Sequence, residues 1–220
     1  MANPLLLTVE THCHTKYSQD CLMEPARMVD ICRARGIDRL CITDHNTARG
    51  ALEMAARWPE LIIPGEEILT TRGELLAYFI RAEVPAGLSP LETIARLRAQ
   101  EAVISVSHPY ELQRHGWTEP ELRALLPHVD AIEVFNARCL TSAPNDRALA
   151  LAHETGILGT VGSDAHSYRE LGRATLQLPP FDGAEAFRQA LQKARFNTRL
   201  SSPLIHLTSR WAVLVKRIRG

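Results

Sequence analysis

The sequence predicts an α/β fold in which parallel strands alternate with crossover helices. Short apolar runs alternate with longer segments of helical period over most of the 220 residues, a pattern typical of βαβ units. No internal repeat, low-complexity tract or Pro/Gly/Ser-rich linker interrupts this alternation. With 45% hydrophobic residues, a chain of this length can bury a substantial core. We therefore expect one main domain.

Eight short apolar runs are the predicted strands. They comprise residues 5–10, 39–42, 61–63, 75–80, 103–106, 131–135, 157–161 and 175–178. The predicted helices comprise residues 25–35, 89–100, 145–155 and 182–194. Gly36 and Gly156 follow two of these segments and suit the left-handed position that ends a helix. Ser89, followed by Pro90, begins another helix as its N-cap.

The last residues of the chain depart from this alternation. Residues 1–197 carry it, whereas the tail 198–220 combines apolar side chains around Trp211 with a basic end that includes Lys216 and Arg217. No sustained apolar face is expected to accompany these charges. The tail is therefore predicted to be a helix packed on the main domain rather than a partner or membrane contact.

Charge and cysteine content limit the partners and the compartment. Lys+Arg 25 and Asp+Glu 25 give a formal net charge of +0, so no overall field attracts long nucleic acid or an anionic membrane. An aromatic content of 5% offers few platforms for stacking on a single strand. The five cysteines form an odd set without CxxC spacing, which favours a reducing cytoplasm. The first residues show neither a signal peptide nor a membrane span.

Residues that commonly bind metals follow one predicted strand after another. They are His12 and His14, Asp44 and His45, Glu66 and Glu67, His108, Asn136, and Asp164 and His166. In a barrel of parallel strands the carboxyl ends converge on one face, where such enzymes hold their chemistry. The pattern therefore predicts that these distant side chains meet in one pocket.

Each position also has a structural interpretation when it is taken alone. The i, i+2 spacing of His12 and His14 puts two imidazoles on one face of any extended segment, and Asp44 could cap the next helix. Glu66 and Glu67 cannot both point inward from a strand, and we assign Glu67 to the metal. Four further histidines are expected to be structural: His115, His128, His153 and His206.

A serine nucleophile is an alternative at the last of these strand ends. Ser163 and His166 could belong to a catalytic triad. However, the segment Gly162-Ser163-Asp164-Ala165-His166 lacks the second glycine of a Gly-x-Ser-x-Gly elbow. Metal binding explains more of the pattern.

Taken together, these motifs resemble those of the PHP family of metal-dependent phosphoesterases, named for its polymerase and histidinol phosphatase members. Four motifs occur in the family's order over most of the chain, with a glutamate segment between the second and the third. They are Glu10-Thr11-His12-Cys13-His14-Thr15, with Glu10 in place of the leading aspartate, then Thr43-Asp44-His45-Asn46, Gly65-Glu66-Glu67-Ile68, His108-Pro109 and Ser163-Asp164-Ala165-His166.

The resemblance implies a distorted (β/α)7 barrel that holds two or three divalent metal ions, Zn²⁺, Mn²⁺ or Fe²⁺, at the strand ends. The implied ligands are His12, His14 and Asp164 for one ion, Glu67 and His108 for a second, and Asp20, His45 and His166 for a third. The family's further histidine after the bridging glutamate is missing, and Glu74 is its expected substitute. An anionic oxygen at this place favours Mn²⁺ or Fe²⁺ over Zn²⁺.

The implied activity is hydrolysis of a phosphoester, by a phosphatase or a phosphodiesterase, through a metal-bridging hydroxide. His12, His14 and Asp164 are expected to be catalytic because they hold the metal that supplies this hydroxide. The expected substrate contacts are Arg138, Asn136 and Lys16, with Arg114 as a further cation. The neutral net charge favours a small phosphorylated substrate or a nucleotide.

Three other functions are open at this point. A 5′-end-directed nucleotide or short-RNA exonuclease would use the same metal chemistry. A non-catalytic metal-binding accessory module would keep the ligands but close the coordination sphere. A histidine-lined aminohydrolase barrel fits the ordered motifs less well. The association state of the chain is also open.

Overall fold

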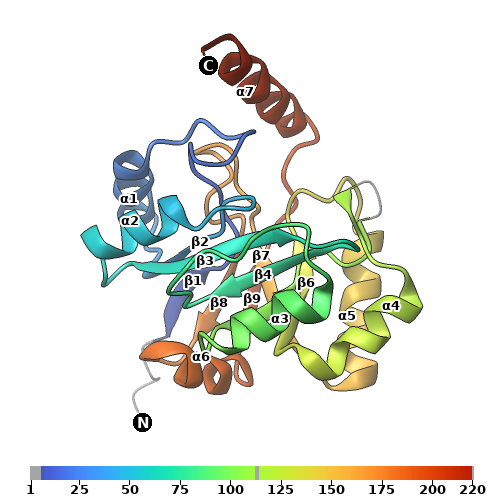
Figure 1. Ribbon diagram of the computed structural model, residues 1–220. Helices are drawn as coiled ribbons and strands as arrows, with labels where there is room; N and C mark the ends of the chain where they lie inside the picture. Colours follow the sequence, from blue (N-terminus) through green and yellow to red (C-terminus); the bar gives the residue numbers. More distant parts are fainter. Residues whose placement is uncertain (1–5, 112–113, 220) are drawn as a thin grey trace.

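The computed structural model describes residues 6–111 and 114–219 (Figure 1). Within these residues, nine strands form one sheet and seven α-helices accompany it. The strands are β1 Leu7–Glu10, β2 Arg39–Ile42, β3 Ile62–Leu69, β4 Glu74–Tyr78, β5 Val103–Val106, β6 Ala131–Asn136, β7 Leu158–Gly162, β8 Ala174–Leu178 and β9 Arg195–Thr198. The helices are α1 Pro25–Ala34, α2 Arg49–Arg57, α3 Pro90–Arg98, α4 Glu119–Leu125, α5 Ala143–Thr155, α6 Gly183–Leu191 and α7 Ile205–Arg219, with a short 3-10 helix, η2 Leu126–His128, after α4.

The sheet curls into a nearly closed barrel. Its strand order is β7-β6-β5-β4-β3-β2-β1-β8-β9. The chain beyond β1 returns to the end of β7, where Cys13 bridges to Ala165. Gly162 permits this approach, because a Cβ at that position would lie 2.3 Å from the His12 Cβ. The expectation of a distorted α/β barrel is confirmed.

Some strand pairs are antiparallel, which corrects the expectation of purely parallel strands. β4 runs antiparallel to β3 and β5, and β8 runs antiparallel to β1. Only residues 70–73 connect β3 to β4, too few for a crossover helix, and the Gly73 amide donates to the Thr70 hydroxyl at 3.2 Å in this turn. The hairpin extends β3 beyond the predicted 61–63, so Glu66 and Glu67 lie within the strand rather than after it.

Several other elements have the bounds or the end signals that the local sequence predicts. β2 and β5 have the predicted bounds. Gly156 ends α5 at φ +73°, and Gly36 follows α1 at φ +66°. Ser89 and Glu92 form a capping box at the start of α3. Four elements, α2, α4, η2 and β9, have no counterpart among the predicted segments. Residue 5 of the first predicted strand lies outside the described residues.

Two apolar clusters hold the layers of the molecule together. The larger one joins the barrel strands to α3, α4, α5 and α6, and it contains the buried rings of Tyr78 and Phe187. The smaller one packs α1 and α2 against β2 through Met28, Met54 and Leu40. The helices thereby cover the outside of the barrel and leave the carboxyl ends of its strands accessible from one side.

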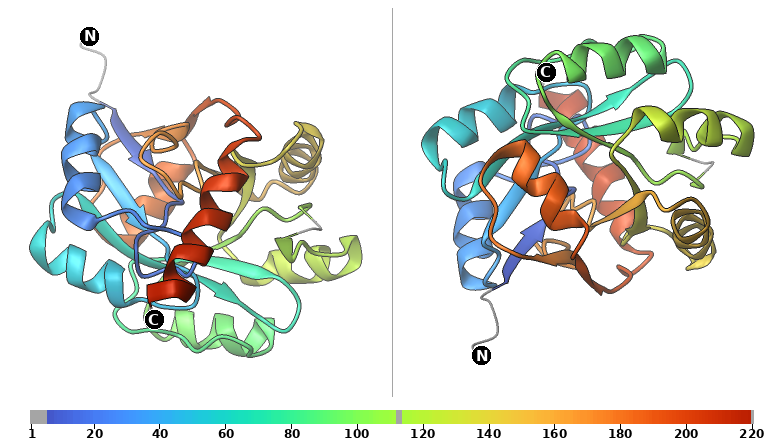
Figure 2. Two further views of the ribbon diagram at one scale, coloured as in Figure 1. Left: turned by 90° about the horizontal axis from the view of Figure 1, so that it is seen from above. Right: turned by 90° about the horizontal axis from the view of Figure 1, so that it is seen from below.

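Helix α7 lies across this side, over the mouth of the barrel (Figure 2). On its inner face Ala212 is buried, the Ser209 hydroxyl accepts from Arg138 at 2.9 Å, and the Lys216 ammonium donates to the Lys16 carbonyl. The helical register gathers apolar residues on its outer face, which corrects the expectation that the tail lacks a sustained apolar face. These exposed residues are Leu207, Trp211, Leu214 and Ile218.

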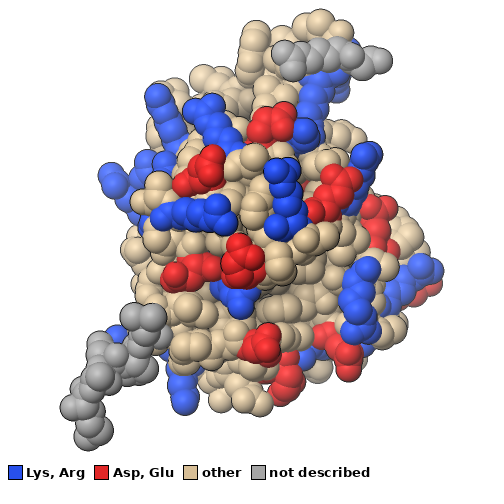
Figure 3. Space-filling model, turned by 90° about the vertical axis from the view of Figure 1, so that its left-hand side faces the viewer, with Lys and Arg blue, Asp and Glu red and all other residues tan. Residues whose placement is uncertain are grey.

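The distribution of surface charge and the state of the cysteines follow the balanced charge and the odd cysteine count of the sequence. All five cysteines are free and buried. Basic and acidic side chains are intermixed on the face shown in Figure 3. None of the helices in residues 6–111 and 114–219 is long and apolar enough to cross a membrane.

Candidate metal centre

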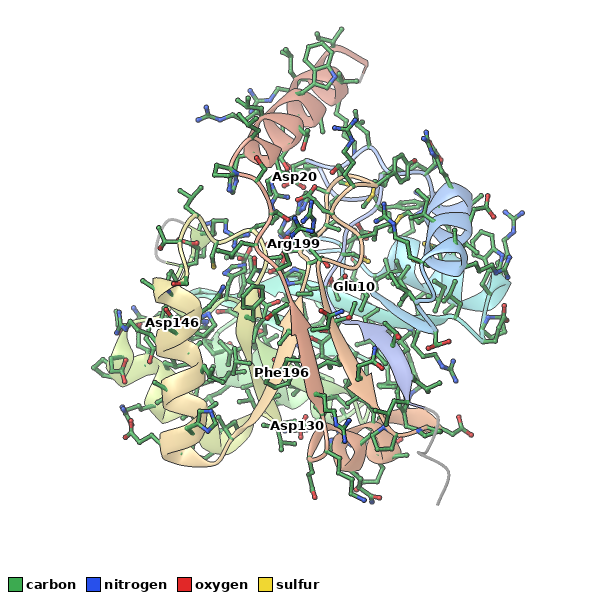
Figure 4. The ribbon with its side chains drawn as sticks, turned by 180° about the vertical axis from the view of Figure 1, so that it is seen from behind. Glu10, Asp20, Asp130, Asp146, Phe196 and Arg199 are labelled. Carbon is green, nitrogen blue, oxygen red and sulfur yellow. The ribbon has the colours of Figure 1, made fainter. Side chains whose placement is uncertain are left out.

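All of the predicted metal ligands meet at one end of the barrel, which the carboxyl ends of its parallel strands and the amino end of β4 form together. They come from loops and strands that are far apart in sequence: His12, His14, Asp20, His45, Glu67, Glu74, His108, Asp164 and His166. Figure 4 shows Asp20 between the barrel and α7, at the outer edge of this cluster. The barrel therefore converts separation in sequence into contact in space.

His12, His14 and Asp164 form a first triad of possible ligands. Asp164 Oδ1 lies 3.2 Å from His14 Nε2 and 3.7 Å from His12 Nε2. The extended chain after β1 turns both imidazoles to one side, as their i, i+2 spacing predicts. Asp164 faces them from the turn after β7 and has φ +50°, a backbone conformation that is uncommon and strained for a residue other than glycine.

His45, Glu67 and Glu74 form a second triad. Glu67 Oε2 lies 3.0 Å from His45 Nδ1 and 3.2 Å from His12 Nε2. This carboxylate therefore faces two triads, as a bridging ligand must. His108 joins the second triad, because its Nε2 lies 3.2 Å from Glu67 Oε1 and 3.4 Å from Glu74 Oε2.

His14, His45 and His166 form a third triad. Asp20 lies beside it, with Oδ2 2.9 Å from His166 Nε2 and 3.8 Å from His45 Nε2. The family resemblance implied Asp20, His45 and His166 for one ion, and the structure adds His14 to that group. His14 and His45 each belong to two triads, so the three groups share one continuous cluster.

The cluster fits divalent cations. Several of its buried atoms lie close to one another but do not have the geometry of a hydrogen bond with any described residue: His12 Nε2, His14 Nε2, Asp20 Oδ1, Glu67 Oε2, Asp164 Oδ1 and His166 Nε2. A buried polar atom without a partner is costly. Convergent lone pairs of imidazole and carboxylate groups are the donor set that Zn²⁺, Mn²⁺ and Fe²⁺ accept.

The imidazoles of the cluster differ in their pKa values. Burial lowers the pKa of His12 and of His45, but the negative charge of Glu67 outweighs it and raises both, so a metal at these two would replace a proton. Burial and the neighbouring His166 and His45 hold the pKa of His14 well below its usual value. This imidazole is therefore neutral and keeps the lone pair that a metal needs. Burial and the negative charge of Glu67 raise the pKa of Glu74 to about 7, because two close buried carboxylates repel one another. A divalent cation at these oxygens would relieve that repulsion.

Glu133 on β6 is a further functional residue, absent from the predicted set. Its Oε1 lies 2.9 Å from His12 Nδ1, and its Oε2 accepts from the His108 amide at 2.9 Å. A carboxylate at Nδ1 holds the proton there and leaves Nε2 free to bind a metal. The available signal was a single acidic residue inside the apolar run 131–135.

Asn136 orients the site, which corrects the expectation that it contacts the substrate. Its amide nitrogen donates to Glu133 at 3.0 Å and to Asp164 at 3.1 Å. Its amide oxygen accepts from Arg114 at 3.2 Å and from the Arg138 amide at 2.9 Å. The side chain is fully buried, and its polar atoms are already occupied by protein partners.

Two arginines border the cluster, whereas Lys16 does not. Arg114 donates to Asp164 Oδ2, and Arg138 donates to the Asp164 carbonyl at 3.4 Å. Lys16 pairs with Glu24 at 2.8 Å and lines a separate, smaller pocket. The structure therefore places Lys16 away from the cluster, contrary to the expected substrate contact, because its side chain pairs with Glu24 in the other pocket.

Asp44 and Ser163, two polar residues of the sequence motifs, bond to other parts of the protein chain. Asp44 accepts from the Thr15 amide and hydroxyl, both at 2.6 Å, and from the Ser18 hydroxyl at 2.7 Å. It therefore stabilises the turn after β1. The Ser163 hydroxyl donates to Glu10, and no histidine of the described chain bonds it, so the serine-nucleophile alternative is not supported.

The cluster opens into a cleft of about 850 Å³. Cavities of this size accommodate small molecules and nucleotides. Helix α7 contributes Ser209, Arg210 and His206 to the wall of the cleft, and His115 also lines it. The two histidines, expected to be purely structural, therefore face the site.

The barrel and its ligand cluster together define a metal-dependent α/β-barrel protein. The chain belongs to the PHP family, as its motifs indicated. The profile of the PHP domain matches residues 10–69, and that of the PHP-associated region matches residues 143–196. This family comprises metal-dependent phosphoesterases and related hydrolases.

The chain is also similar to two relatives and to two solved structures. The chain is 35% identical to the uncharacterized protein MJ0417 of Methanocaldococcus jannaschii, over 78% of this chain and 70% of that protein. It is 33% identical to the uncharacterized protein MJ1587 of the same organism, over 65% and 90%. PsfC from Pseudomonas syringae has a TM-score of 0.72 at 21% identity, covering 96% of this chain and 99% of that one. A candidate metal-dependent phosphoesterase from Bifidobacterium adolescentis has a TM-score of 0.62 at 17% identity, covering 87% and 98%. At these identities the two structures show a shared fold.

Proposed function

We propose that this protein hydrolyses a phosphoester at a di- or trinuclear metal site. The observation that carries the proposal is the set of convergent ligand atoms without hydrogen-bond partners at the base of an open cleft. Divalent cations held there neutralise phosphoryl oxygens and lower the pKa of a coordinated water from about 15.7 toward 7. Membership in the PHP family supports the same chemistry.

The side chains of this protein hold and orient the reacting groups. His12, His14 and Asp164 would hold one ion, and Glu67 lies between this group and the second triad, with Oε2 3.2 Å from His12 Nε2 and 3.0 Å from His45 Nδ1. Arg114 lies against Asp164 and Asn136, so its guanidinium borders the position of a phosphoryl group at the metals. A guanidinium can bind two phosphoryl oxygens at once, which would align the ester for attack.

Catalysis fits this cluster better than a purely structural metal site does. Structural sites are closed by protein ligands on all sides, whereas this cluster faces a cleft of about 850 Å³. The formal net charge of +0 supports a small phosphorylated substrate or nucleotide over a long nucleic acid.

A substrate panel tests the proposal. The purified chain is assayed with Mn²⁺, Zn²⁺, Fe²⁺ and Mg²⁺ for phosphate release from an aryl phosphate, a mononucleotide, histidinol phosphate and a 5′-phosphorylated oligonucleotide. We expect metal-dependent release from at least one small monoester. Processing of the oligonucleotide alone would favour the exonuclease alternative, and no hydrolysis with any metal would overturn the proposal.

Two pairs of variants assign the activity to the cluster. His12→Ala and Asp164→Ala should abolish turnover, because each removes a ligand of the first triad. His153→Ala and Asp146→Ala are matched controls, since both side chains are exposed on α5, and they should keep full activity. Wild-type hydrolysis by either ligand variant would show that the cluster is not the catalyst.

A further inference from the structure

The outer face of α7 carries a contiguous stripe of exposed apolar side chains. Leu207, Trp211, Leu214 and Ile218 are 59%, 62%, 48% and 76% exposed. Successive spacings of four, three and four residues place them on one side of the helix. Single exposed apolar residues are ordinary on a protein surface, whereas a contiguous group of them marks an interaction site. We call these four residues the apolar stripe.

The inner face of the same helix already packs on the barrel. Ala212 is buried, the Ser209 hydroxyl accepts from Arg138 at 2.9 Å, and the Lys216 ammonium donates to the Lys16 carbonyl. These contacts fix which side of α7 faces outward. The helix also projects beyond the rest of the molecule (Figure 1), so a flat surface can reach the whole apolar stripe.

The charge of this part of the chain is one-sided. The whole chain has a formal net charge of +0, yet the segment 186–220 contains lysines and arginines but no aspartate or glutamate. Arg210 and Arg217 are exposed on α7, and their separation of seven residues puts both along one edge of the apolar stripe. Cationic side chains beside an apolar helix face are typical of helices that lie in the surface of anionic membranes.

A second copy of this chain fits the apolar stripe less well. The spacing of the four residues also suits the pairing of two helices. However, α7 has 15 residues, so its outer face is about 22 Å long and roughly 10 Å wide, which is small against the roughly 800 Å² that each partner in a stable dimer buries. Antiparallel pairing of two copies of α7 would also bring together two edges of the same charge, and the helix contains no acidic residue to compensate.

We propose that α7 binds an anionic lipid membrane through the apolar stripe, with Arg210 and Arg217 against the lipid headgroups. The apolar side chains enter the boundary between headgroups and acyl chains, where the amphipathic indole of Trp211 is favoured. Each exposed arginine adds electrostatic attraction to anionic lipids. The inner face of α7 stays on the barrel, so the helix lies between the membrane and the mouth of the cleft.

Sedimentation with lipid vesicles tests the proposal. The full chain is mixed with vesicles of phosphatidylcholine and phosphatidylglycerol in equal parts, and with vesicles of phosphatidylcholine alone. We expect binding to the anionic vesicles to be about tenfold or more tighter, and to weaken as the salt concentration rises. The fluorescence of Trp211 should shift to shorter wavelength on binding. Trp211→Phe should lose most of this shift, because Trp58 and Trp117 lie outside α7.

Variants on the outer face of α7 locate the binding. The double variant Leu207→Ser, Leu214→Ser should weaken binding to the anionic vesicles by about tenfold or more. Leu91→Ser is the matched control, since it removes a leucine that is 56% exposed on α3. Arg217→Glu should weaken binding by about fivefold or more, whereas Arg96→Glu, at an exposed position on α3, should not. Circular dichroism checks that each variant is folded.

Several results would overturn the proposal. They are no sedimentation with the anionic vesicles, equal binding to the two kinds of vesicle, and an equal loss of binding in Leu91→Ser. Analytical ultracentrifugation without lipid tests the second copy, and we expect the double variant to keep the association state of the wild type. A dimer that dissociates in the double variant would assign the apolar stripe to a second copy instead. None of these measurements needs turnover, so they are independent of the proposed hydrolysis.

Discussion

Glu133 Oε1 lies 2.9 Å from Nδ1 of His12, and this contact determines which imidazole nitrogen faces the ligand cluster. The carboxylate also reaches the backbone of the loop that carries His108. One buried side chain on β6 therefore orients ligands from two other strand ends. Partners of this kind are as important to a metal site as the ligands that they hold.

Glu133→Gln should weaken metal binding by about 10–100-fold. The amide keeps the shape of the side chain but removes the charge that holds the proton on His12 Nδ1. Competition with a chromogenic chelator measures the affinity. Glu154→Gln, at an exposed position on α5, is the control, and equal affinities in the two variants would contradict the role of Glu133.

Gly162→Ala should lower the free energy of unfolding by about 1–3 kcal/mol. The added Cβ would overpack the contact between the chain after β1 and the end of β7. It would lie 2.3 Å from the His12 Cβ and 2.5 Å from Glu133 Oε1. Gly159→Ala in the same strand is the control, since its nearest atoms are side-chain carbons of Val134 and Phe196 at 3.0 and 3.1 Å. Urea unfolding measures both variants, and equal losses would argue against a special role for Gly162.

Glu74→His should shift metal preference from Mn²⁺ or Fe²⁺ toward Zn²⁺. Glu74 lies 3.4 Å from His108 Nε2, and an imidazole in its place would replace a hard anionic oxygen with a nitrogen ligand that Zn²⁺ binds well. Elemental analysis after dialysis against an equal mixture of the metals measures the preference. An unchanged metal ratio would show that Glu74 does not select the ion.

Metal binding should raise the melting temperature of the metal-free protein. A ligand that binds only the folded state adds about 2.7 kcal/mol of stability at a concentration of 100 Kd, equivalent to roughly 5–10 °C for a chain of this size. Scanning calorimetry with and without a chelator measures the shift. His14→Ala should reduce it, because His14 belongs to two triads. No shift with any of the four metals would count against the centre.

The five thiols should be unreactive in the folded protein. All five are free and buried, and burial raises the pKa of Cys32 to about 12 and that of Cys13 well above its usual value. Thiolate, the reactive form, is therefore scarce at pH 8. Ellman's reagent should label all five only after unfolding. Rapid labelling of the native protein would contradict the packing around α1 and the barrel.

Local sequence was sufficient for many features of the fold and for the residues that meet in the cluster. The bounds of β2 and β5 follow from short apolar runs, and the ends of two helices follow from Gly36 and Gly156, because these signals act over a few residues. The residues of the cluster were recognisable because histidine and carboxylate side chains recur where the predicted strands end. Helix α2 was less visible, since it buries only Gly50, Ala51 and Met54, which give a weak apolar period.

Sequence alone therefore determined the α/β class, the family and the residues that form the cluster. The tertiary structure alone decided that β4 turns back on β3, that Lys16 points away from the cleft, and that α7 covers the mouth of the barrel. It also revealed Glu133, which contacts His12 across 121 positions of sequence. The physical reason is that burial, charge pairing and hydrogen bonding depend on which distant segments meet, and no local periodicity specifies those meetings.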